Sequence, residues 1–237
     1  MMERTADASP RSKARIAGVF YLLTFLTGGV AVFVSGTLVV SGDATATAAN
    51  ILAHETLFRL GFAAYLLVVA SYIAVTALFY ELFKPVNRSL YLLAAFFSLV
   101  GCAIQASACL LYLATLVVMG GAEYLSVFKL EQLQALGLMF LKLHAQAFNF
   151  GLVFFGFYCL LIAYLIFRST FLPRILGVLM AFAGLGWLIF LSPPLANSLS
   201  PYILAPGILG EGSLTLWLLV KGVNVQRWNE HAGTTAD

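Results

Sequence analysis

The thirty residues Leu90–Met119 read LYLLAAFFSLVGCAIQASACLLYLATLVVM and contain no Asp, Glu, Lys, Arg or His. An α-helix rises about 1.5 Å per residue, so about 20 apolar residues cross the roughly 30 Å hydrocarbon core of a bilayer. A long apolar run without charges is typical of a transmembrane helix rather than of a helix in a soluble domain. This stretch therefore predicts a helix that spans a membrane.

The composition of the whole chain agrees with that prediction. Of 237 residues, 62% are apolar and 10% are charged, whereas an ordinary soluble domain is about 45–50% apolar and about 25% charged. A globular chain of this size cannot bury so much apolar surface. The composition excludes a soluble enzyme, a disordered chain and a disulfide-stapled secreted module. The net charge is only +3 and the basic residues are dispersed, so no nucleic-acid partner is expected.

Six apolar runs are long enough to cross a bilayer, which predicts an all-α, polytopic membrane helix bundle over residues 16–224. Residues 1–15 and 225–237 are polar and are predicted to be disordered cytoplasmic tails. Asp43 precedes an Ala/Thr-rich segment and predicts a short outer-surface helix between spans one and two. The six predicted spans are Ile16–Val40, Leu60–Phe83, Leu90–Met119, Ala135–Phe167, Ile175–Leu191 and Tyr202–Val220.

The basic residues are distributed unequally between the two sides of this predicted bundle. Arg59 and Lys129 fall on one side, Lys142 is ambiguous, and ten basic residues fall on the other. Because Lys and Arg are enriched in cytoplasmic loops, the bias places both termini in the cytoplasm. The ten residues are Arg4, Arg11, Lys13, Arg15, Lys84, Arg88, Arg168, Arg174, Lys221 and Arg227.

Glu211 is the residue that costs most to place in a membrane. It lies ten residues before Lys221, so it is about 15 Å from the inner interface and close to the bilayer midplane. An ionised carboxylate there costs at least about 2.5 kcal/mol. One interpretation is a proton or ligand site, in which Pro206 and the neighbouring glycines allow a kinked or unwound helix. The other is a structural hydrogen bond with glycines that permit close packing. Gln105, near the middle of span three, either bonds a neighbouring helix or lines the same site.

His144 is predicted to lie near the outer headgroup level, because about 20 residues back from Arg168 already reach the outer boundary. Lys142, Gln146 and Asn149 share one helical face, and His144 points away from it. Two alternatives follow: a helix that emerges into water, or an outward-facing polar vestibule. The vestibule candidates are His144, Gln146, Asn149 and Arg59.

Two interfacial carboxylates suggest ion pairs. Glu55 and Arg59 are four residues apart and predict a surface pair, with a lipid phosphate or substrate anion as the alternative partner of Arg59. Glu81 lies at the predicted inner interface. Arg174 or Arg88 is its expected partner there, and Glu81–Arg174 is the candidate ion pair at the inner interface.

No signature of a metal site, a cofactor or an enzyme is present. The three cysteines lie inside apolar runs without a CxxC pair, and His54 and His144 lack the spacing of a ligand set. No metal and no cofactor are expected. The chain also lacks a P-loop and a nucleophile elbow. An enzyme is therefore the least favoured class, although it stays open.

Three segments resemble a known family. They read NILAHETLFRLG at Asn50–Gly61, YLIFRSTFLPRILG at Tyr164–Gly177 and LWLLVKGVN at Leu216–Asn224. The chain resembles, over roughly residues 16–224, the bacterial membrane family numbered 4386 among the domains of unknown function. The resemblance implies a multi-pass protein of the inner (plasma) membrane and implies no activity.

The same resemblance implies ionisable residues in some members at three positions inside the spans. This chain departs from that pattern, because Tyr65, Tyr72 and Ser98 occupy those positions. A function that depends on a charge pair between spans two and three is therefore not expected here.

Three function classes are left. The first is a transporter or binding protein for a small solute or lipophilic ligand that uses the midplane carboxylate. A weak internal repeat, in which spans one and five both begin Arg-Ile-x-Gly-Val, fits that class. The second is a non-catalytic scaffold, sensor or lipid-interacting subunit, and the third is a membrane-embedded enzyme. The expected partners are membrane lipids and a small-molecule ligand; a homodimer is open, with no motif to fix its interface.

Overall fold

The computed structural model describes residues 9–200 and 202–234, which form helices and connecting turns with no strand among them. Within these residues, five helices are long and apolar enough to cross a membrane. The all-α class is confirmed, whereas the number of crossings and their orientation stay predictions. The α-helices are α1 Pro10–Leu38, α2 Ala44–Ala53, α3 Glu55–Met119, α4 Leu130–Arg168, α5 Arg174–Leu188, α6 Pro193–Ser198, α7 Ala205–Val220 and α8 Val225–Thr234; the 3-10 helices are Glu123–Leu125, Ile189–Leu191 and Tyr202–Leu204.

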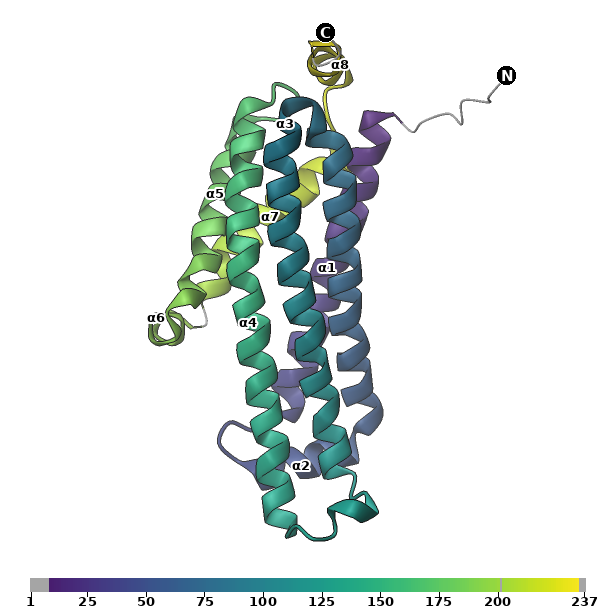
Figure 1. Cartoon of the computed structure of the whole chain (residues 1–237), viewed down its shortest axis with the longest axis vertical. Helices are drawn as coiled ribbons and strands as arrows, with labels where there is room; N and C mark the ends of the chain where they lie inside the picture. The colour runs from purple at the N-terminus through teal and green to yellow at the C-terminus, as the bar shows by residue number, and fades with distance from the viewer. Residues whose placement is uncertain (1–8, 201, 235–237) are drawn as a thin grey trace, which may run out of the picture. The chain divides into compact units, whose positions relative to one another are not determined.

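Helix α3 is a hairpin of two limbs. Pro85 lies inside it, and Asn87 has the extended backbone angles φ −163° and ψ 102°. Proline removes a backbone donor, and the Asn87 side chain accepts a hydrogen bond from the Leu90 amide at 2.9 Å, which starts the second limb. Thr76 Oγ1 and Ser98 Oγ are 2.6 Å apart, so the limbs run back along each other (Figure 1). Two of the predicted spans therefore form the two limbs of α3.

The described residues divide into two compact units. Unit 1 takes in those of 1–22, 71–101 and 152–237, and unit 2 those of 23–70 and 102–151. Helices α1, α3 and α4 contribute residues to both units. Helices α5 to α8 belong to unit 1, and α2 belongs to unit 2.

Glycines allow the helices of unit 1 to pack closely. A Cβ atom at Gly210 of α7 would lie 2.3 Å from the Leu179 carbonyl oxygen and 2.7 Å from Ala183 Cβ of α5. On the other side of α5, a Cβ at Gly184 would lie 2.8 Å from the Gly156 carbonyl oxygen of α4. Small residues at such contacts are typical of helix packing in membranes.

Helix α7 is continuous from Ala205 to Val220, so the kinked or unwound helix considered beside Glu211 is not present. Pro206 lies in the first turn, where a helical amide has no partner to lose. Gly207 and Gly210 instead face α5, as the close-packing alternative expects.

The core of unit 2 is aromatic and aliphatic. The rings of Phe58 and Tyr112 stack with their centroids 4.1 Å apart, and Ile51 of α2 is buried against the same cluster. Helix α2 begins after Asp43, whose Oδ1 accepts a hydrogen bond from the Ala46 amide at 2.9 Å. The predicted short helix and its cap are confirmed, and its position at a membrane surface stays a prediction.

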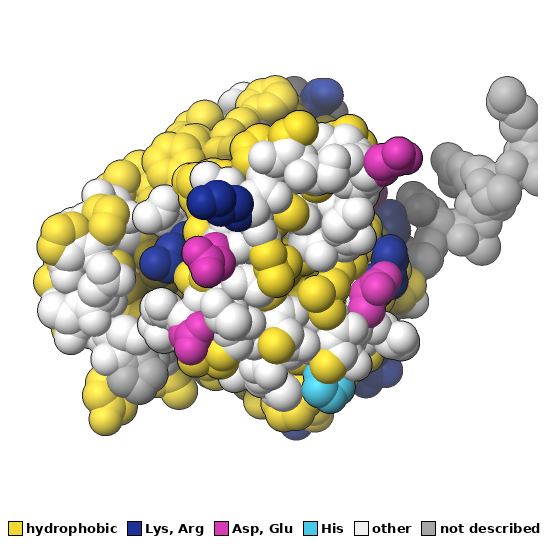
Figure 2. Space-filling view, turned by 90° about the horizontal axis from the view of Figure 1, so that it is seen from below, with side chains coloured by type: hydrophobic (Ala, Val, Ile, Leu, Met, Phe, Trp, Pro, Cys, Tyr) yellow, Lys and Arg dark blue, Asp and Glu magenta, His cyan; other side chains and the backbone are white. Residues whose placement is uncertain are grey.

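The polar end of unit 2 carries α2 and the connection between α3 and α4. Figure 2 shows acidic and basic side chains among uncharged ones on this face. The exposed charged residues in and next to these elements are Asp43, Glu55, Arg59, Glu123, Lys129 and Glu131.

Along the helices, large apolar side chains face outward. Phe33, Phe96 and Leu110 are 68%, 63% and 67% exposed. Extended apolar surface of this kind marks contact with a membrane or another apolar partner. The exposure pattern thus agrees with the composition.

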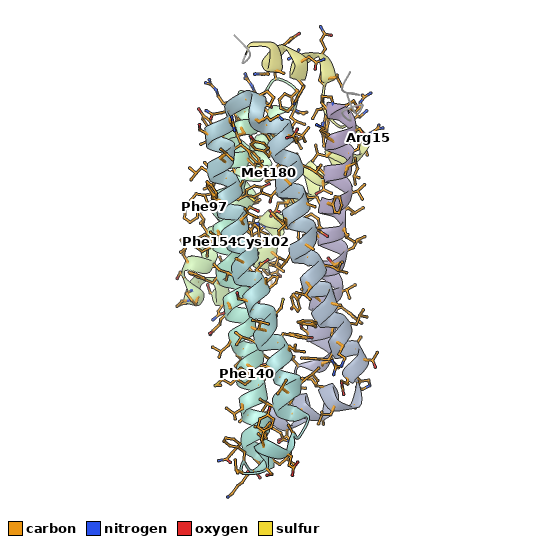
Figure 3. The ribbon with its side chains drawn as sticks, turned by 45° about the vertical axis from the view of Figure 1, so that its right-hand side comes forward. Arg15, Phe97, Cys102, Phe140, Phe154 and Met180 are labelled. Atoms are coloured by element: carbon orange, nitrogen blue, oxygen red, sulfur yellow. The ribbon has the colours of Figure 1, made fainter. Side chains whose placement is uncertain are left out.

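One end of unit 1 gathers the basic helix ends. Arg15 near the start of α1 (Figure 3) donates to the Val220 carbonyl oxygen at 3.3 Å. Trp228 of α8 donates through Nε1 to the Leu82 carbonyl oxygen near the turn of α3 at 2.9 Å. The start of α1, the turn of α3, the end of α7 and α8 therefore meet (Figure 1).

The structure differs from the two predicted disordered tails. Residues 225–234 form α8, because the Asn224 side chain caps its first turn through the Arg227 amide at 3.1 Å and Trp228 anchors it. Helix α1 already begins at Pro10. Residues 1–8 and 235–237 of the predicted tails lie outside the described residues.

Candidate functional site

Glu211 lies in the middle of α7 and is 5% exposed. Helix α7 runs unbroken to Val220, which keeps the carboxyl group about 15 Å along the axis from Lys221. Gly210 precedes Glu211 and brings α7 against α5. The close approach of the two helices helps to bury the carboxyl group.

Three donors from three other helices of unit 1 bind the carboxyl group. Tyr21 of α1 donates to Oε2 at 2.5 Å, and Tyr72 of α3 donates to the same oxygen at 2.9 Å. Trp187 of α5 donates through Nε1 to Oε1 at 2.5 Å. The two tyrosine oxygens are 3.2 Å apart. Glu211 therefore links α7 to α1, α3 and α5; we call Glu211, Tyr21, Tyr72 and Trp187 the Glu211 cluster.

Aromatic side chains enclose the Glu211 cluster. The centroid of the Tyr72 ring lies 4.3 Å from the ring centroid of Phe155 and 5.8 Å from that of Tyr158. The Tyr21 ring lies 6.0 Å from that of Phe79. Because the surroundings are apolar, the hydrogen bonds to the carboxyl group are stronger than they would be in water, and the loss of any one costs more.

The donors determine where a proton on Glu211 is tolerated. An ionised carboxylate only accepts hydrogen bonds, so it matches three donors. A protonated carboxyl group must itself donate, and Trp187 Nε1 cannot accept. Tyr21 and Tyr72 can accept, so a proton on Oε2 can be donated to one of their hydroxyl oxygens. That hydroxyl then turns and donates to the other tyrosine. The cluster can thus hold either state of the carboxyl group by turning two hydroxyls.

The sequence identified Glu211 but not its donors. Tyr and Trp are ordinarily interfacial residues in membrane proteins. Tyr72, however, lies twelve residues before Lys84, which is about 18 Å along a helix. A tyrosine at that depth in a predicted span was a signal that its hydroxyl needed a partner.

Gln105 is not part of the Glu211 cluster. It belongs to unit 2, is 2% exposed and donates through Nε2 to the Phe148 carbonyl oxygen at 3.3 Å. Its backbone carbonyl accepts from the Cys109 thiol at 3.3 Å. This is the interhelical role that the sequence allowed as one alternative.

The four vestibule candidates have different surroundings. His144 is buried in unit 2, with its Nδ1 2.9 Å from the Ala108 carbonyl oxygen. Gln146 is exposed and Asn149 is half-buried. Arg59 pairs with Glu55 at 2.7 Å on the exposed start of α3, so the predicted surface pair is confirmed. His144 is the one of the four that packs inside the helices.

Glu81 has partners other than Arg174. Its carboxylate lies 3.2 Å from Lys13 Nζ of α1 and 3.0 Å from Lys84 Nζ on the same helix. Arg174 is exposed at the start of α5. The candidate pair Glu81–Arg174 is therefore wrong, because the turn of α3 brings Glu81 to the start of α1.

Among residues 9–200 and 202–234, no group of three or more His, Cys, Asp and Glu side chains is arranged to hold a metal ion. Cys102, Cys109 and Cys159 are buried, and none of the three forms a disulfide with another described residue.

The long apolar helices and the outward-facing apolar side chains indicate a multi-pass α-helical membrane protein. Within that class the chain belongs to the family described as "Domain of unknown function (DUF4386)", which matches residues 16–222. It is also 25% identical over 159 residues to an "Uncharacterized protein" of Archaeoglobus fulgidus, covering 66% of this chain and 80% of that protein. No solved structure matches the chain.

Proposed function

We propose that this protein binds or transports a small solute or lipophilic ligand and couples that step to the protonation of Glu211. The observation that carries the proposal is one buried carboxyl group that accepts hydrogen bonds from α1, α3 and α5 at once. In the orientation we propose, the basic end of unit 1 faces the cytoplasm.

Protonation of Glu211 changes the hydrogen bonds that join α7 to α1, α3 and α5. The ionised carboxylate accepts from Tyr21, Tyr72 and Trp187, whereas the neutral group must find an acceptor among the same side chains. Because each helix contributes one partner, a single proton alters the contacts of α7 with three neighbours. Intramembrane carboxylates that bias helix contacts in this way are typical of proton-linked transporters.

Trp187 provides a direct test, because its indole donates to Glu211. We expect the tryptophan emission of the purified protein in lipid nanodiscs to change with pH over about pH 4–10 as Glu211 titrates. The change should be absent in Glu211→Gln and in Trp187→Phe, which retains Trp217 and Trp228. If Glu211→Gln titrates like the wild type, Glu211 is not the proton site and the proposal fails.

Native mass spectrometry of the same two proteins tests the ligand. A bound small molecule in the wild type that is lost in Glu211→Gln supports a binding role and supplies its mass. If both proteins show only the mass of the polypeptide, and if the tryptophan emission of the wild type and of Glu211→Gln depends on pH in the same way, the Glu211 cluster only stabilises the packing of the helices.

A second candidate, a lipid-interacting protein, is favoured by one further observation. A cavity of about 650 Å³ at the basic end of unit 1 is lined by Arg11, Lys221 and Arg227, with the ring of Trp217 beside them. Guanidinium groups bind phosphates bidentately, and basic pockets at the inner interface suit anionic headgroups.

The lipid candidate is tested by retention of lipid through purification. We expect native mass spectra of the wild type to retain an anionic lipid such as phosphatidylglycerol, and Arg11→Gln with Arg227→Gln to lose it. Arg59→Gln is the matched control, because Arg59 is exposed in unit 2. Equal retention by all three proteins would exclude the cavity as a headgroup site.

A further inference from the structure

Unit 2 contains a cavity of about 390 Å³ between α1, both limbs of α3 and α4. This volume falls within the range of small-molecule sites, about 300–1,000 Å³. The cavity is lined mostly by apolar and aromatic side chains with a few polar groups, the usual composition of a ligand pocket. Each of these four helical segments contributes to the wall: α1 through Ser35, the two limbs of α3 through Tyr65 and Tyr112, and α4 through His144.

The hydrogen bond of His144 determines which of its nitrogens carries a proton. Nδ1 lies 2.9 Å from the Ala108 carbonyl oxygen. A carbonyl oxygen only accepts, so Nδ1 is the donor, and Nε2 of the neutral ring is an acceptor with a free lone pair.

His144 Nε2 is buried and has no hydrogen-bond partner among the residues that the structure describes. The side chain as a whole is 4% exposed. A buried acceptor without a partner is costly, and natural structures satisfy nearly all such groups. An unpaired acceptor on a side chain that lines a cavity points to a donor supplied from outside the chain.

Aromatic rings surround the imidazole. The Tyr65 ring centroid is 4.6 Å away, that of Tyr112 is 5.0 Å away and that of Phe148 is 5.9 Å away. The nearest ring, Tyr65, is held by a 3.3 Å hydrogen bond between its hydroxyl and Ser35 Oγ. Because Nε2 is buried, a ligand in the cavity must displace a neighbouring side chain to reach it. We take that side chain to be Tyr65, whose movement breaks the Ser35 hydrogen bond and its ring contacts.

We propose that this cavity is a binding site for a neutral, amphipathic small molecule with an aromatic or aliphatic body and one hydroxyl donor, an alcohol or a phenol. The hydroxyl donates to His144 Nε2, and the body packs against the Tyr65 and Tyr112 rings. A carboxylate has no proton to donate to Nε2. A cation would meet Lys142, which also lines the cavity. This site lies in unit 2 and does not depend on the role proposed for Glu211.

The test uses the imidazole as its own reporter. The chain has three histidines, so ¹⁵N-histidine labelling in nanodiscs yields few ring signals, and His144→Gln assigns those of His144. The probe is p-cresol, and toluene is its partner without the hydroxyl. We expect p-cresol to move the His144 Nε2 signal, saturably, from the unpaired to the hydrogen-bonded range. Toluene should leave it unpaired and bind about five-fold more weakly, as expected for one hydrogen bond.

A blocking variant keeps the reporter in place. Ala145 lines the cavity and is exposed, so Ala145→Phe should fill the space without removing His144. We expect it to abolish the p-cresol shift. Ala135→Phe, at an exposed position of the same helix outside the cavity wall, is the matched control and should retain the shift, as should Glu211→Gln.

Three outcomes would overturn the proposal. One is an equal response to p-cresol and toluene, which would indicate partitioning without recognition. Another is a His144 Nε2 signal that is hydrogen-bonded before addition and unchanged by p-cresol, which would assign the partner as water only. The third is a p-cresol shift that survives Ala145→Phe.

Discussion

Glu211 and His144 are both buried side chains, but their polar atoms are paired differently. Each carboxyl oxygen of Glu211 accepts at least one hydrogen bond from a tyrosine or tryptophan. His144 has one nitrogen paired with a backbone carbonyl, and the other has no partner among the described residues. A fully paired buried group stabilises one arrangement of its helices, whereas a half-paired group is available to a ligand.

The pairing of Glu211 predicts a large effect of its removal. Glu211→Leu removes the acceptor shared by Tyr21, Tyr72 and Trp187, at about 1–3 kcal/mol for each buried donor that is left unpaired. We expect the free energy of unfolding in detergent, measured by denaturant titration of the near-UV circular dichroism, to fall by about 3 kcal/mol or more. Glu211→Gln retains one acceptor oxygen and should lose less.

The control is Glu131→Leu, which removes a carboxylate that is exposed at the start of α4. Its effect should stay within about 1 kcal/mol, because only an interaction with the helix dipole is lost. A loss at Glu211→Leu no larger than that of the control would mean that the three hydrogen bonds contribute nothing net.

At the scale of helices, the contact of α5 with α7 positions the Glu211 cluster. Gly210 lets α7 approach the backbone of α5, and that approach brings Trp187 within reach of the carboxyl group. At Gly212, two residues further along the same helix, an added Cβ would have no neighbour within 4 Å in the part of the chain that the structure describes. Gly210 is therefore required for close packing on α5, whereas Gly212 is not.

This difference predicts opposite signs for two similar substitutions. Gly210→Ala forces a methyl group against the Leu179 carbonyl and should destabilise the protein by about 1–3 kcal/mol. Gly212→Ala meets open space in a helix interior and should stabilise it by up to about 1 kcal/mol. Melting temperatures of the two variants in the same detergent check this. Shifts of the same sign would contradict the packing role of Gly210.

At the scale of the whole chain, basic side chains collect where the start of α1, the turn of α3 and the end of α7 meet. The hydrogen bonds of Arg15 and Trp228 hold this end of unit 1 together. The predicted orientation places it in the cytoplasm, because cytoplasmic ends retain Lys and Arg. The turn of α3 at Asn87 makes the two limbs separate crossings in that arrangement.

Labelling with a membrane-impermeant maleimide in intact and permeabilised cells tests this orientation. The native cysteines are buried, so background reaction should be low. Ser12→Cys and Gln226→Cys, both at exposed positions of unit 1, should react only after permeabilisation. Ser126→Cys, exposed between α3 and α4, should react in intact cells. Labelling of Gln226→Cys in intact cells would rule out a cytoplasmic C-terminus.

The sequence by itself determined the class of protein, the approximate positions of the long apolar helices, the cap at Asp43, the Glu55–Arg59 pair and the cost of burying Glu211. These follow from local chemistry: a bilayer requires continuous apolar helices, and caps and i,i+4 pairs depend on neighbours along the chain. Only the tertiary structure decided which side chains meet Glu211, that Gln105 bonds elsewhere, that Glu81 pairs with Lys13 and Lys84, and that His144 lines a cavity. Those contacts join residues far apart along the chain, because the packing of helices sets them, and periodicity along one helix does not specify its neighbours.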